Sequence, residues 1–196
     1  MKLVIIKYNA GNVQSVSFAL ERLGVEFTIT DDAEEIKGAD KVLFPGVGEA
    51  STTMKFLKER NLDRVIPDLK QPVLGICLGM QLMCRFSEEN NTTCLGIFDE
   101  GVKLFDSSPT QKVPHMGWNQ LTLTESWLDP ALGGKFVYFV HSYYVPVNER
   151  SSAVTDYIVP FSAAMHRDNF YAVQFHPEKS ADAGEIVLKS FLNLVQ

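Results

Sequence analysis

The feature that most constrains the fold of this chain is a series of short apolar runs separated by amphipathic segments. Leu3 to Tyr8 and Val73 to Ile76 are almost wholly apolar, whereas Val13 to Leu23 carries its apolar residues at helical spacing. Strands that are apolar on both faces are typical of parallel sheets covered by helices. The first ninety residues therefore predict strands at Leu3 to Tyr8, Val25 to Thr30, Lys41 to Phe44 and Val73 to Ile76, and helices at Val13 to Leu23, Ala50 to Arg60 and Leu78 to Phe86.

The second half of the chain has a different pattern, in which short strands follow one another with only turns between them. The predicted strands are Gly101 to Phe105, Gly117 to Thr124, Phe136 to Phe139, Ala153 to Tyr157, Ser162 to His166 and Tyr171 to Phe175. A last amphipathic helix is predicted from about Ala181 to Leu194. We expect a single α/β domain over residues 1–196, a three-layer α/β/α sandwich with a mostly parallel central sheet and an antiparallel or mixed C-terminal extension.

The composition excludes several classes of partner. The 196 residues are 45% hydrophobic, which is enough for a proper core, and their formal net charge is −6 with no basic stripe that could follow a phosphate backbone. We therefore expect no nucleic-acid partner. The run Leu3 to Ile6 is too short for a signal peptide or a membrane span, and three cysteines without metal-ligand spacing are typical of a reducing compartment. These observations predict a cytoplasmic protein that binds no membrane.

One cysteine stands between two glycines. Cys77 lies two residues from Gly75 and from Gly79, after a predicted strand and before a predicted helix. This G-x-C-x-G pattern is the cysteine form of the nucleophile elbow, a tight turn that exposes a reactive atom. At a helix start, free N–H groups stabilise a thiolate, and the N–H of Leu78 would face a developing oxyanion. The alternative is a buried structural cysteine between packing glycines, and this pattern alone does not decide between them.

A thiol nucleophile needs a base, and the base needs an orienting group. Among the four histidines, His176 is followed at strand spacing by the acid Glu178, with a proline between them, while His166 has Asp168 at the same spacing. Residues two apart in an extended segment face the same way, and the proline after His176 favours an extended predecessor. Together with the Cys77 elbow, this spacing predicts a Cys-His-Glu triad. His141 and His166 are interpreted as packing histidines.

A glycine-rich loop follows the third predicted strand, with the sequence Phe44-Pro45-Gly46-Val47-Gly48. In an open α/β sheet, ligands bind beyond the carboxyl ends of the strands, and this loop leaves the same edge as the cysteine elbow. Its backbone N–H groups would turn toward an anion there. The position of the loop therefore makes it the second half of an oxyanion hole.

In the order PGVG, GICLGMQ and HPE, these segments resemble the class I, triad-type glutamine amidotransferases, and the resemblance extends over nearly the whole chain. The family implies a flavodoxin-like fold. By resemblance, Cys77 is the nucleophile, His176 is the general base and acid, and Glu178 orients His176.

The resemblance also assigns residues around the substrate. It implies an oxyanion hole formed by the N–H groups of Leu78 and of Val47 or Gly48. The residues that it implies for glutamine itself are Gln81 for the α-substituents, Glu89 for the amino group, and Ser142 and Tyr143 for the carboxylate.

Three further segments resemble one subfamily, the glutaminase subunits of imidazole glycerol phosphate synthases. They are Tyr8 to Ser15, Val113 to Asn119, which contains PHMGWN, and Val140 to Tyr144. The first segment departs from the family pattern, because Lys7 and Asn9 stand where an acid and a glycine are usual. Asparagine tolerates a left-handed backbone, so we expect the turn to survive.

The subfamily implies a reaction and a partner. Cys77 attacks the side-chain amide of L-glutamine, and His176 protonates the leaving ammonia and then activates the water that cleaves the glutamyl thioester. No metal or organic cofactor is needed. The implied partner is a (β/α)8-barrel cyclase subunit in a heterodimer, which uses the ammonia to make imidazole glycerol phosphate and the AICAR nucleotide for histidine and purine synthesis. The interface residues implied or proposed are Asn12, Tyr138 and Lys179.

Three alternatives stay open at this point. The chain would serve another synthase, such as anthranilate or aminodeoxychorismate synthase, although PHMGWN argues against this. A cysteine peptidase or γ-glutamyl hydrolase on the same scaffold would act without any synthase. A non-catalytic binding subunit would leave Cys77 purely structural, which the complete triad set argues against.

Overall fold

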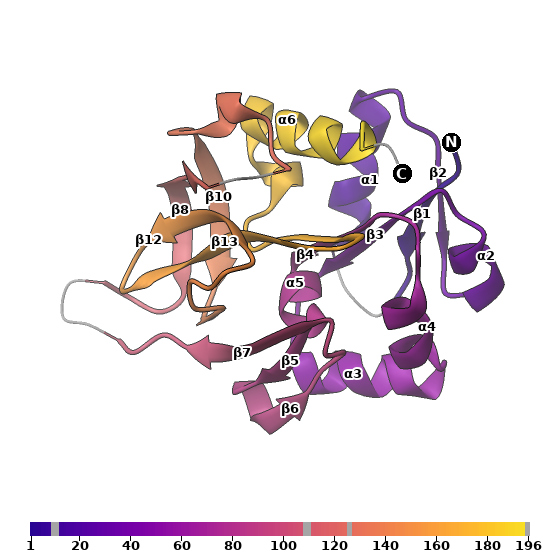
Figure 1. The fold of residues 1–196 in the computed structure, drawn as a ribbon, viewed down its shortest axis with the longest axis horizontal. Coiled ribbons are helices and arrows are strands. Elements are labelled where there is room, and N and C mark those ends of the chain that lie inside the picture. The colour runs from indigo at the N-terminus through magenta and orange to yellow at the C-terminus, as the bar shows by residue number, and fades with distance from the viewer. Residues whose placement is uncertain (9–11, 108–110, 125–126, 195–196) are drawn as a thin grey trace.

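The computed structural model describes residues 1–8, 12–107, 111–124 and 127–194. Within these ranges, an eight-stranded sheet forms the centre of the molecule, with helices on both of its faces (Figure 1). In their order across the sheet, the strands are β2 (Phe27–Thr30), β1 (Leu3–Ile6), β3 (Lys41–Gly46), β4 (Val73–Cys77), β14 (Phe170–Val173), β13 (Pro160–Arg167), β12 (Ser151–Asp156) and β9 (Thr122–Leu123).

The sheet has a parallel half and an antiparallel half. All pairings from β2 through β1, β3 and β4 to β14 are parallel. The pairings from β14 through β13 and β12 to β9 are antiparallel. This arrangement confirms the predicted mixed C-terminal extension of a mostly parallel sheet, and it shows that β14, the last strand of the chain, joins the two halves.

Two smaller sheets lie beside the central one. One pairs β8 (His115–Gln120) with β10 (Phe136–His141) as an antiparallel ribbon. The other has the order β11 (Tyr143–Tyr144), β7 (Phe98–Leu104), β5 (Cys84–Ser87) and β6 (Thr92–Thr93). Short 3₁₀ helices span Glu89–Asn91, Pro130–Leu132 and Pro177–Lys179.

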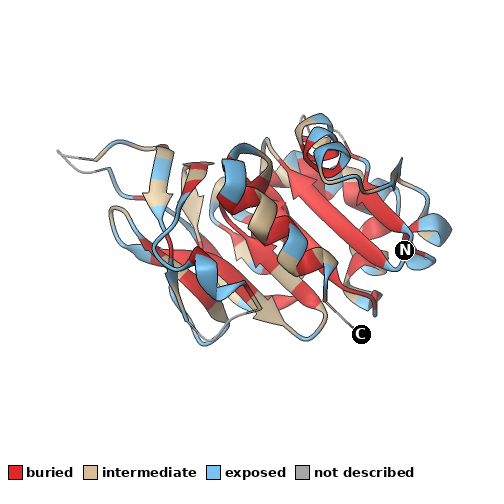
Figure 2. Ribbon diagram, turned by 90° about the horizontal axis from the view of Figure 1, so that it is seen from above, coloured by how far each residue is buried: buried red, intermediate tan, exposed pale blue. Residues whose placement is uncertain are grey.

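The core is divided by the sheet into two layers of packing. The helices on one face are α1 (Val13–Arg22) and α6 (Ala181–Leu192), and those on the other are α2 (Ala33–Lys37), α3 (Ala50–Glu59), α4 (Leu62–Asp68) and α5 (Leu78–Met83). Because side chains alternate along a strand, Ile5 packs with the first group and Val4 with the second. Figure 2 shows the central strands as continuously buried. The short apolar runs are therefore explained by burial on both faces.

The helix predicted from Leu78 to Phe86 is too long. Helix α5 ends at Met83, and Cys84 has extended backbone with ψ 174°. The chain then continues as β5, which pairs with β6 and β7. Strand pairing has thus overridden the helical pattern of an apolar segment. The strand predicted from Gly117 to Thr124 is also wrong as one element, because it divides at Leu121 between two different sheets.

Two short helices were not predicted. Helix α2 begins after Asp32, whose carboxylate accepts hydrogen bonds from the backbone N–H groups of Glu34 and Glu35 at 2.9 Å each, an ordinary N-cap. Helix α4 contains Pro67 one residue before its end. Both are only a turn or two long, so they carry little periodic signal.

The carboxyl ends of four neighbouring parallel strands meet at one edge of the sheet. Asn12 follows β1, the loop with Val47 and Gly48 follows β3, and Cys77 is the last residue of β4. His176 follows β14. Ligands bind at this edge in open α/β sheets, so the fold brings segments from both ends of the chain to one place.

Candidate active site

Cys77 lies in a strained turn between β4 and α5. Its φ of 54° and ψ of −107° are unusual for a residue with a side chain, and such a conformation costs on the order of 1–3 kcal/mol. Close packing holds the turn, since a Cβ atom on Gly79 would lie 1.9 Å from the carbonyl oxygen of Phe44. The geometry is that of the nucleophile elbow expected from the sequence.

His176 and Glu178 form a buried pair. Nδ1 of His176 lies 2.7 Å from Oε1 of Glu178, and both side chains are buried. The same Oε1 accepts a hydrogen bond of 2.8 Å from Nδ2 of Asn12. The carboxylate therefore fixes the ring so that Nδ1 carries a proton toward it and Nε2 faces away from it.

The surroundings of His176 favour its charged form. Burial lowers the pKa, but interactions with Cys77 and then with Glu178 outweigh burial and raise the pKa of His176 to about 10. Nε2 is buried and has no hydrogen-bond partner among the described residues. An imidazolium beside Cys77 stabilises a thiolate, and the unpartnered Nε2 is the atom that can exchange a proton with the sulfur.

A cavity of about 320 Å³ opens over Cys77. The residues that line it are Val47, Gly48, Cys77, Leu78, Gln81, Glu89, Pro114, Val140, His141, Ser142 and Tyr143. The structure thus brings together around one cavity the residues predicted for the oxyanion hole and for glutamine binding. The assigned roles of these residues stay predictions. His176 and Glu178 lie outside this lining, among the buried groups behind it.

Residues of α5, β11 and the 3₁₀ helix Glu89–Asn91 contribute to this lining. Nε2 of Gln81 donates a hydrogen bond of 2.9 Å to the carbonyl oxygen of Tyr143. Oε2 of Glu89 accepts one of 2.8 Å from the N–H of Ala50. Burial, together with the charge of Glu49, raises the pKa of Glu89. An ammonium group entering the cavity would restore the charge balance beside this carboxylate.

His141 is more than the packing histidine expected from the sequence, because it lines the cavity. Its Nε2 lies 3.1 Å from Nδ1 of His115, and its Nδ1 donates to the carbonyl oxygen of Tyr143 at 2.8 Å. Burial lowers the pKa of His115 to about 4 and that of His141 to about 3. Both rings are therefore neutral at physiological pH. His166 does fit the packing interpretation, stacking on Tyr171 with ring centroids 4.5 Å apart.

One contact of Cys77 was not predicted from the sequence. Gln174 is buried, and its Nε2 lies 3.7 Å from Sγ of Cys77. No sequence pattern marks this residue, because its contact with Cys77 depends on the pairing of β14 with β4.

The three residues suggested for a partner interface have different positions. Asn12 is only 3% exposed and its side chain points inward to Glu178, so the free chain does not present this side chain at its surface. Lys179 is exposed, and its ammonium lies 6.0 Å from the ring centroid of Tyr138, which is half-buried. Of the two departures from the family pattern, Asn9 lies outside the described residues, and the exposed Lys7 donates its backbone N–H to Thr30.

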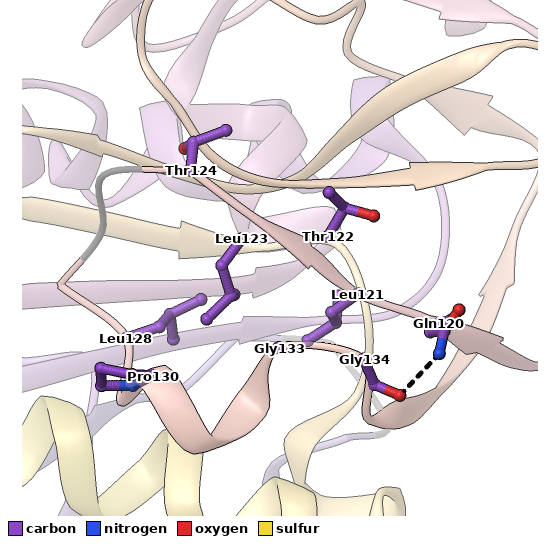
Figure 3. A pocket seen from close by; sticks show the side chains of 9 residues that line it. All are labelled: Gln120, Leu121, Thr122, Leu123, Thr124, Leu128, Pro130, Gly133 and Gly134. Carbon is purple, nitrogen blue, oxygen red and sulfur yellow. Dashed lines mark hydrogen bonds between the residues drawn. The ribbon is translucent and has the colours of Figure 1, made fainter.

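A second hollow of about 500 Å³ lies along β9 and shares no lining residue with the first (Figure 3). Its polar side chain Gln120 is already bonded to the carbonyl oxygen of Gly134 at 2.8 Å. Elsewhere in the described ranges, no three His, Cys, Asp or Glu side chains gather as a metal site would require. The described helices are all too short or too polar to span a bilayer.

Known proteins resemble this chain over its whole length. A protein of Bacteroides fragilis named imidazole glycerol phosphate synthase subunit HisH is 64% identical over 196 residues, covering 99% of this chain and 100% of the relative. The protein of that name from Bacteroides thetaiotaomicron is 60% identical with the same coverage. The one from Vibrio parahaemolyticus is 44% identical, with 98% of each chain covered.

Solved structures share the fold at much lower identity. A glutamine amidotransferase superposes with a TM-score of 0.74 at 18% identity, covering 96% of each chain. PurLQS from Thermotoga maritima gives a TM-score of 0.69 at 15% identity, with 98% of this chain and 97% of that chain covered. The model of the family "glutamine amidotransferase class-I" matches residues 4–194. This chain is therefore a member of the class-I glutamine amidotransferase family.

Proposed function

We propose that this chain is the glutaminase subunit of an imidazole glycerol phosphate synthase. It hydrolyses L-glutamine to glutamate and ammonia and passes the ammonia to a cyclase subunit. The observation that carries the proposal is full-length identity of 64% to a protein of that name, in a chain where Cys77 lines a cavity and interacts with the buried His176–Glu178 pair behind it.

The reaction begins with proton transfer and attack at Cys77. The thiol proton passes to Nε2 of His176, and the thiolate sulfur bonds to the side-chain amide carbon of glutamine. The carbonyl electron pair moves to oxygen, where the N–H of Leu78 and that of Val47 or Gly48 would hold the charge. Loss of one such donor typically costs on the order of 10²–10³ in rate, so the orientation of the 47–48 peptide is a sensitive control point.

Collapse of the tetrahedral intermediate releases ammonia. The imidazolium of His176 gives its proton to the leaving nitrogen, which leaves a glutamyl thioester on Cys77. Neutral His176 then takes a proton from water, and the hydroxide attacks the thioester carbon. The products are glutamate and the free thiol, and Glu178 holds the ring in one orientation through both proton transfers.

Selectivity for glutamine comes from polar and charged side chains that line the cavity. Glu89 carries a negative charge against the substrate's ammonium, while Ser142 and Tyr143 border the position of its carboxylate. Gln81 also lines the cavity, and its side chain is fixed by its hydrogen bond to the Tyr143 carbonyl. A cavity of about 320 Å³ lies within the size range of small-molecule binding sites.

The outer face of the β8–β10 ribbon is the surface that we assign to the cyclase, a (β/α)8-barrel subunit. In the antiparallel register, Trp118 lies opposite Tyr138, and Met116 and Phe136 lie on the same face. Met116, Trp118 and Phe136 are more than half exposed. Such neighbouring aromatic and apolar side chains are typical of an interface core.

This ribbon is bonded directly to the catalytic segment. The carbonyl oxygen of Tyr138 accepts from the N–H of His176 at 2.9 Å, and the N–H of Tyr138 meets Oγ of Ser180 at 2.9 Å. A partner that moves the ribbon therefore moves the backbone of His176. The fold supplies a short route by which cyclase binding can reach the triad.

The test is glutamate release measured for this chain alone, with a cyclase subunit, and with that subunit plus its nucleotide ligand. We expect strong stimulation by partner and ligand, and no release from Cys77→Ala under any condition. Equal release with and without the partner would leave the triad standing but sink the synthase assignment. It would favour a stand-alone γ-glutamyl hydrolase, and stimulation by a different synthase would favour that synthase. Unchanged release from Cys77→Ala would make Cys77 structural.

A further inference from the structure

Gln174 joins the nucleophile to the wall of the cavity. Strand β14 ends at Val173, which pairs with Ile76, so the parallel register places Gln174 alongside Cys77. The residue is 0% exposed, and its Nε2 lies 3.7 Å from Sγ of Cys77. Its Oε1 lies 3.0 Å from Nε2 of Gln81. One buried amide therefore contacts both the reacting sulfur and a residue of the glutamine cavity.

The hydrogen-bond network fixes the direction of both amides. The carbonyl oxygen of Tyr143 can only accept, so the group of Gln81 that lies 2.9 Å from it must be its nitrogen. The second proton of that nitrogen needs an acceptor, and Oε1 of Gln174 is the acceptor in place. The nitrogen of Gln174 is thereby turned toward Cys77, where it donates to the sulfur.

We propose that Gln174 is a positioning residue of this site, which donates a hydrogen bond to the Cys77 thiolate and holds Gln81 in the orientation that lines the cavity. The first role concerns the thiol itself and needs no substrate. The second rests on the proposed glutaminase function.

The contacts of the sulfur explain why such a donor matters. The thiol proton can point to the carbonyl oxygen of Val140, 3.9 Å from Sγ. A carbonyl oxygen offers nothing to a thiolate, because it has no proton to donate. The amide N–H of Gln174 has the opposite preference, since a hydrogen bond to a charged acceptor is stronger than one to a neutral acceptor. Gln174 therefore favours the ionised nucleophile.

Alkylation of Cys77 by iodoacetamide measures this role without glutamine. Gln174→Met removes both hydrogen bonds, whereas Gln174→Glu keeps the size of the side chain and an acceptor for Gln81 but loses the donor. At about pH 7 we expect either change to slow alkylation by about tenfold, which is the factor that one hydrogen bond to a charged group carries. The rate is read from the Cys77 peptide by mass spectrometry, so the other two cysteines do not contribute. Wild-type rates in both variants would overturn the proposal.

Gln71→Met is the matched control. Gln71 is also buried, at 7% exposure, and its Nε2 donates to the carbonyl oxygen of Ile36 at 2.8 Å, away from the cavity. This variant also loses a buried amide, so we expect it to cost stability and to leave the alkylation of Cys77 unchanged. If it slows alkylation as much as Gln174→Met does, the effect is general loosening of the fold and the proposal fails.

The KM for glutamine tests the second role. Gln174→Met frees Gln81, so we expect KM to rise severalfold, whereas Gln174→Glu keeps the acceptor and is expected to lower kcat with KM near that of the wild type. An unchanged KM in Gln174→Met would overturn this part. A chain that hydrolyses no glutamine at all would refute the proposed function, while the alkylation result would still stand by itself.

A measurement on the unaltered chain covers the case in which a variant does not fold. The side-chain amide resonances of Gln174 are expected to shift in an ¹⁵N–¹H NMR spectrum when Cys77 is alkylated, while those of Gln71 stay in place. Unshifted Gln174 resonances would overturn the contact with the sulfur.

Discussion

At the scale of single residues, the proposed triad depends on two close approaches of backbone. Gly79 lets α5 meet β3 behind the strained Cys77, and Gly184 does the same for the other half of the triad. A Cβ atom on Gly184 would lie 1.8 Å from the carbonyl oxygen of Pro177, the residue between His176 and Glu178. Helix α6 therefore supports the His-Pro-Glu segment from directly behind it.

Gly184→Ala is predicted to damage both stability and catalysis. The added methyl group collides with backbone rather than with a flexible side chain, so either α6 or Pro177 must move, at a cost of roughly 3 kcal/mol. Urea denaturation should show this loss, and glutamate release should fall in the fraction that stays folded.

Gly101→Ala is the control for that substitution. Nothing lies within 4 Å of a Cβ atom at Gly101. We expect its free energy of unfolding to stay within about 1 kcal/mol of the wild type. Equal behaviour of the two variants would contradict the tight contact at Gly184.

Sequence spacing identifies residues that stand in a distinctive local pattern. It does not identify residues whose contacts depend on which strands pair and in what register. Cys77 between two glycines, and His176 separated from an acid by a proline, are patterns that could be recognised in the chain itself. Gln174 carries no such mark, because amides serve many purposes. Its contact with Cys77 follows from the pairing of β14 with β4, which joins segments far apart in the sequence. The inward position of Asn12 depends in the same way on Glu178.

At the scale of elements, the β8–β10 ribbon has two different faces. Its outer face carries the exposed aromatic residues, and its inner face carries the register pair of His115 and His141. Ring stacking of His115 on Tyr157, with centroids 4.0 Å apart, and on Phe139 seals this inner face. The inner face of the ribbon therefore packs through two neutral imidazole rings, at positions where aliphatic side chains are usual in a sheet.

This pair predicts a pH dependence of stability. The folded-state pKa values of about 4 for His115 and about 3 for His141 lie below the ordinary value of 6.5. The unfolded chain then binds protons that the folded chain does not, so the stabilisation is full above about pH 6.5 and is lost as the pH falls toward 4. Each group contributes a slope of up to about 1.4 kcal/mol per pH unit in that window.

Urea denaturation between about pH 7 and pH 5 measures this slope. His115→Gln removes one of the two groups, so we expect a shallower fall of the free energy of unfolding than in the wild type. Identical slopes for the two proteins would show that His115 titrates normally in the folded chain.

The sequence predicted helices and strands correctly where a segment contributes to one sheet. It failed where consecutive residues belong to different elements or to different sheets. The apolar residues after Leu78 read as one helix, but the chain leaves α5 at Met83 to pair with β7. The segment around Leu121 similarly contributes to two sheets. In both places the local pattern permits several structures, and contacts with distant strands select one.

At the scale of the whole molecule, the architecture followed from pattern because each half of the sheet has its own sequence signature. Continuous apolar runs indicated parallel strands, and short strands joined by turns indicated antiparallel ones. The ribbon surface could not be foreseen in the same way. Residues Met116, Trp118 and Phe136 are apolar, and only the register shows that they share an exposed face.

Trp118→Ala is predicted to weaken cyclase binding with little effect on the free chain. Trp118 is 53% exposed, so its removal sacrifices little core packing, whereas an aromatic side chain at the centre of an interface commonly contributes 2 kcal/mol or about thirtyfold in Kd. Titration calorimetry with the cyclase subunit measures the change.

Ile29→Ala is the control for Trp118→Ala, because it removes an exposed apolar side chain from a different part of the surface. Ile29 is 42% exposed on β2, at the opposite end of the sheet order from β12 and β9. It should leave the Kd unchanged. Equal affinities for Trp118→Ala and the wild type would place the partner on another surface.

The late position of β14 in the chain determines when during synthesis Cys77 gains its proposed base and its amide donor. A ribosome makes β4 early and β14 almost last, so Cys77 leaves the exit tunnel long before His176 exists. Until then the nascent chain has neither the base nor the amide donor at its sulfur, and its sheet lacks the strand that joins the two halves. A chain that ends before β14 therefore lacks both of these groups. Under the proposed function, a chain that stops before β14 would hydrolyse no glutamine, because His176 and Glu178 come after that strand.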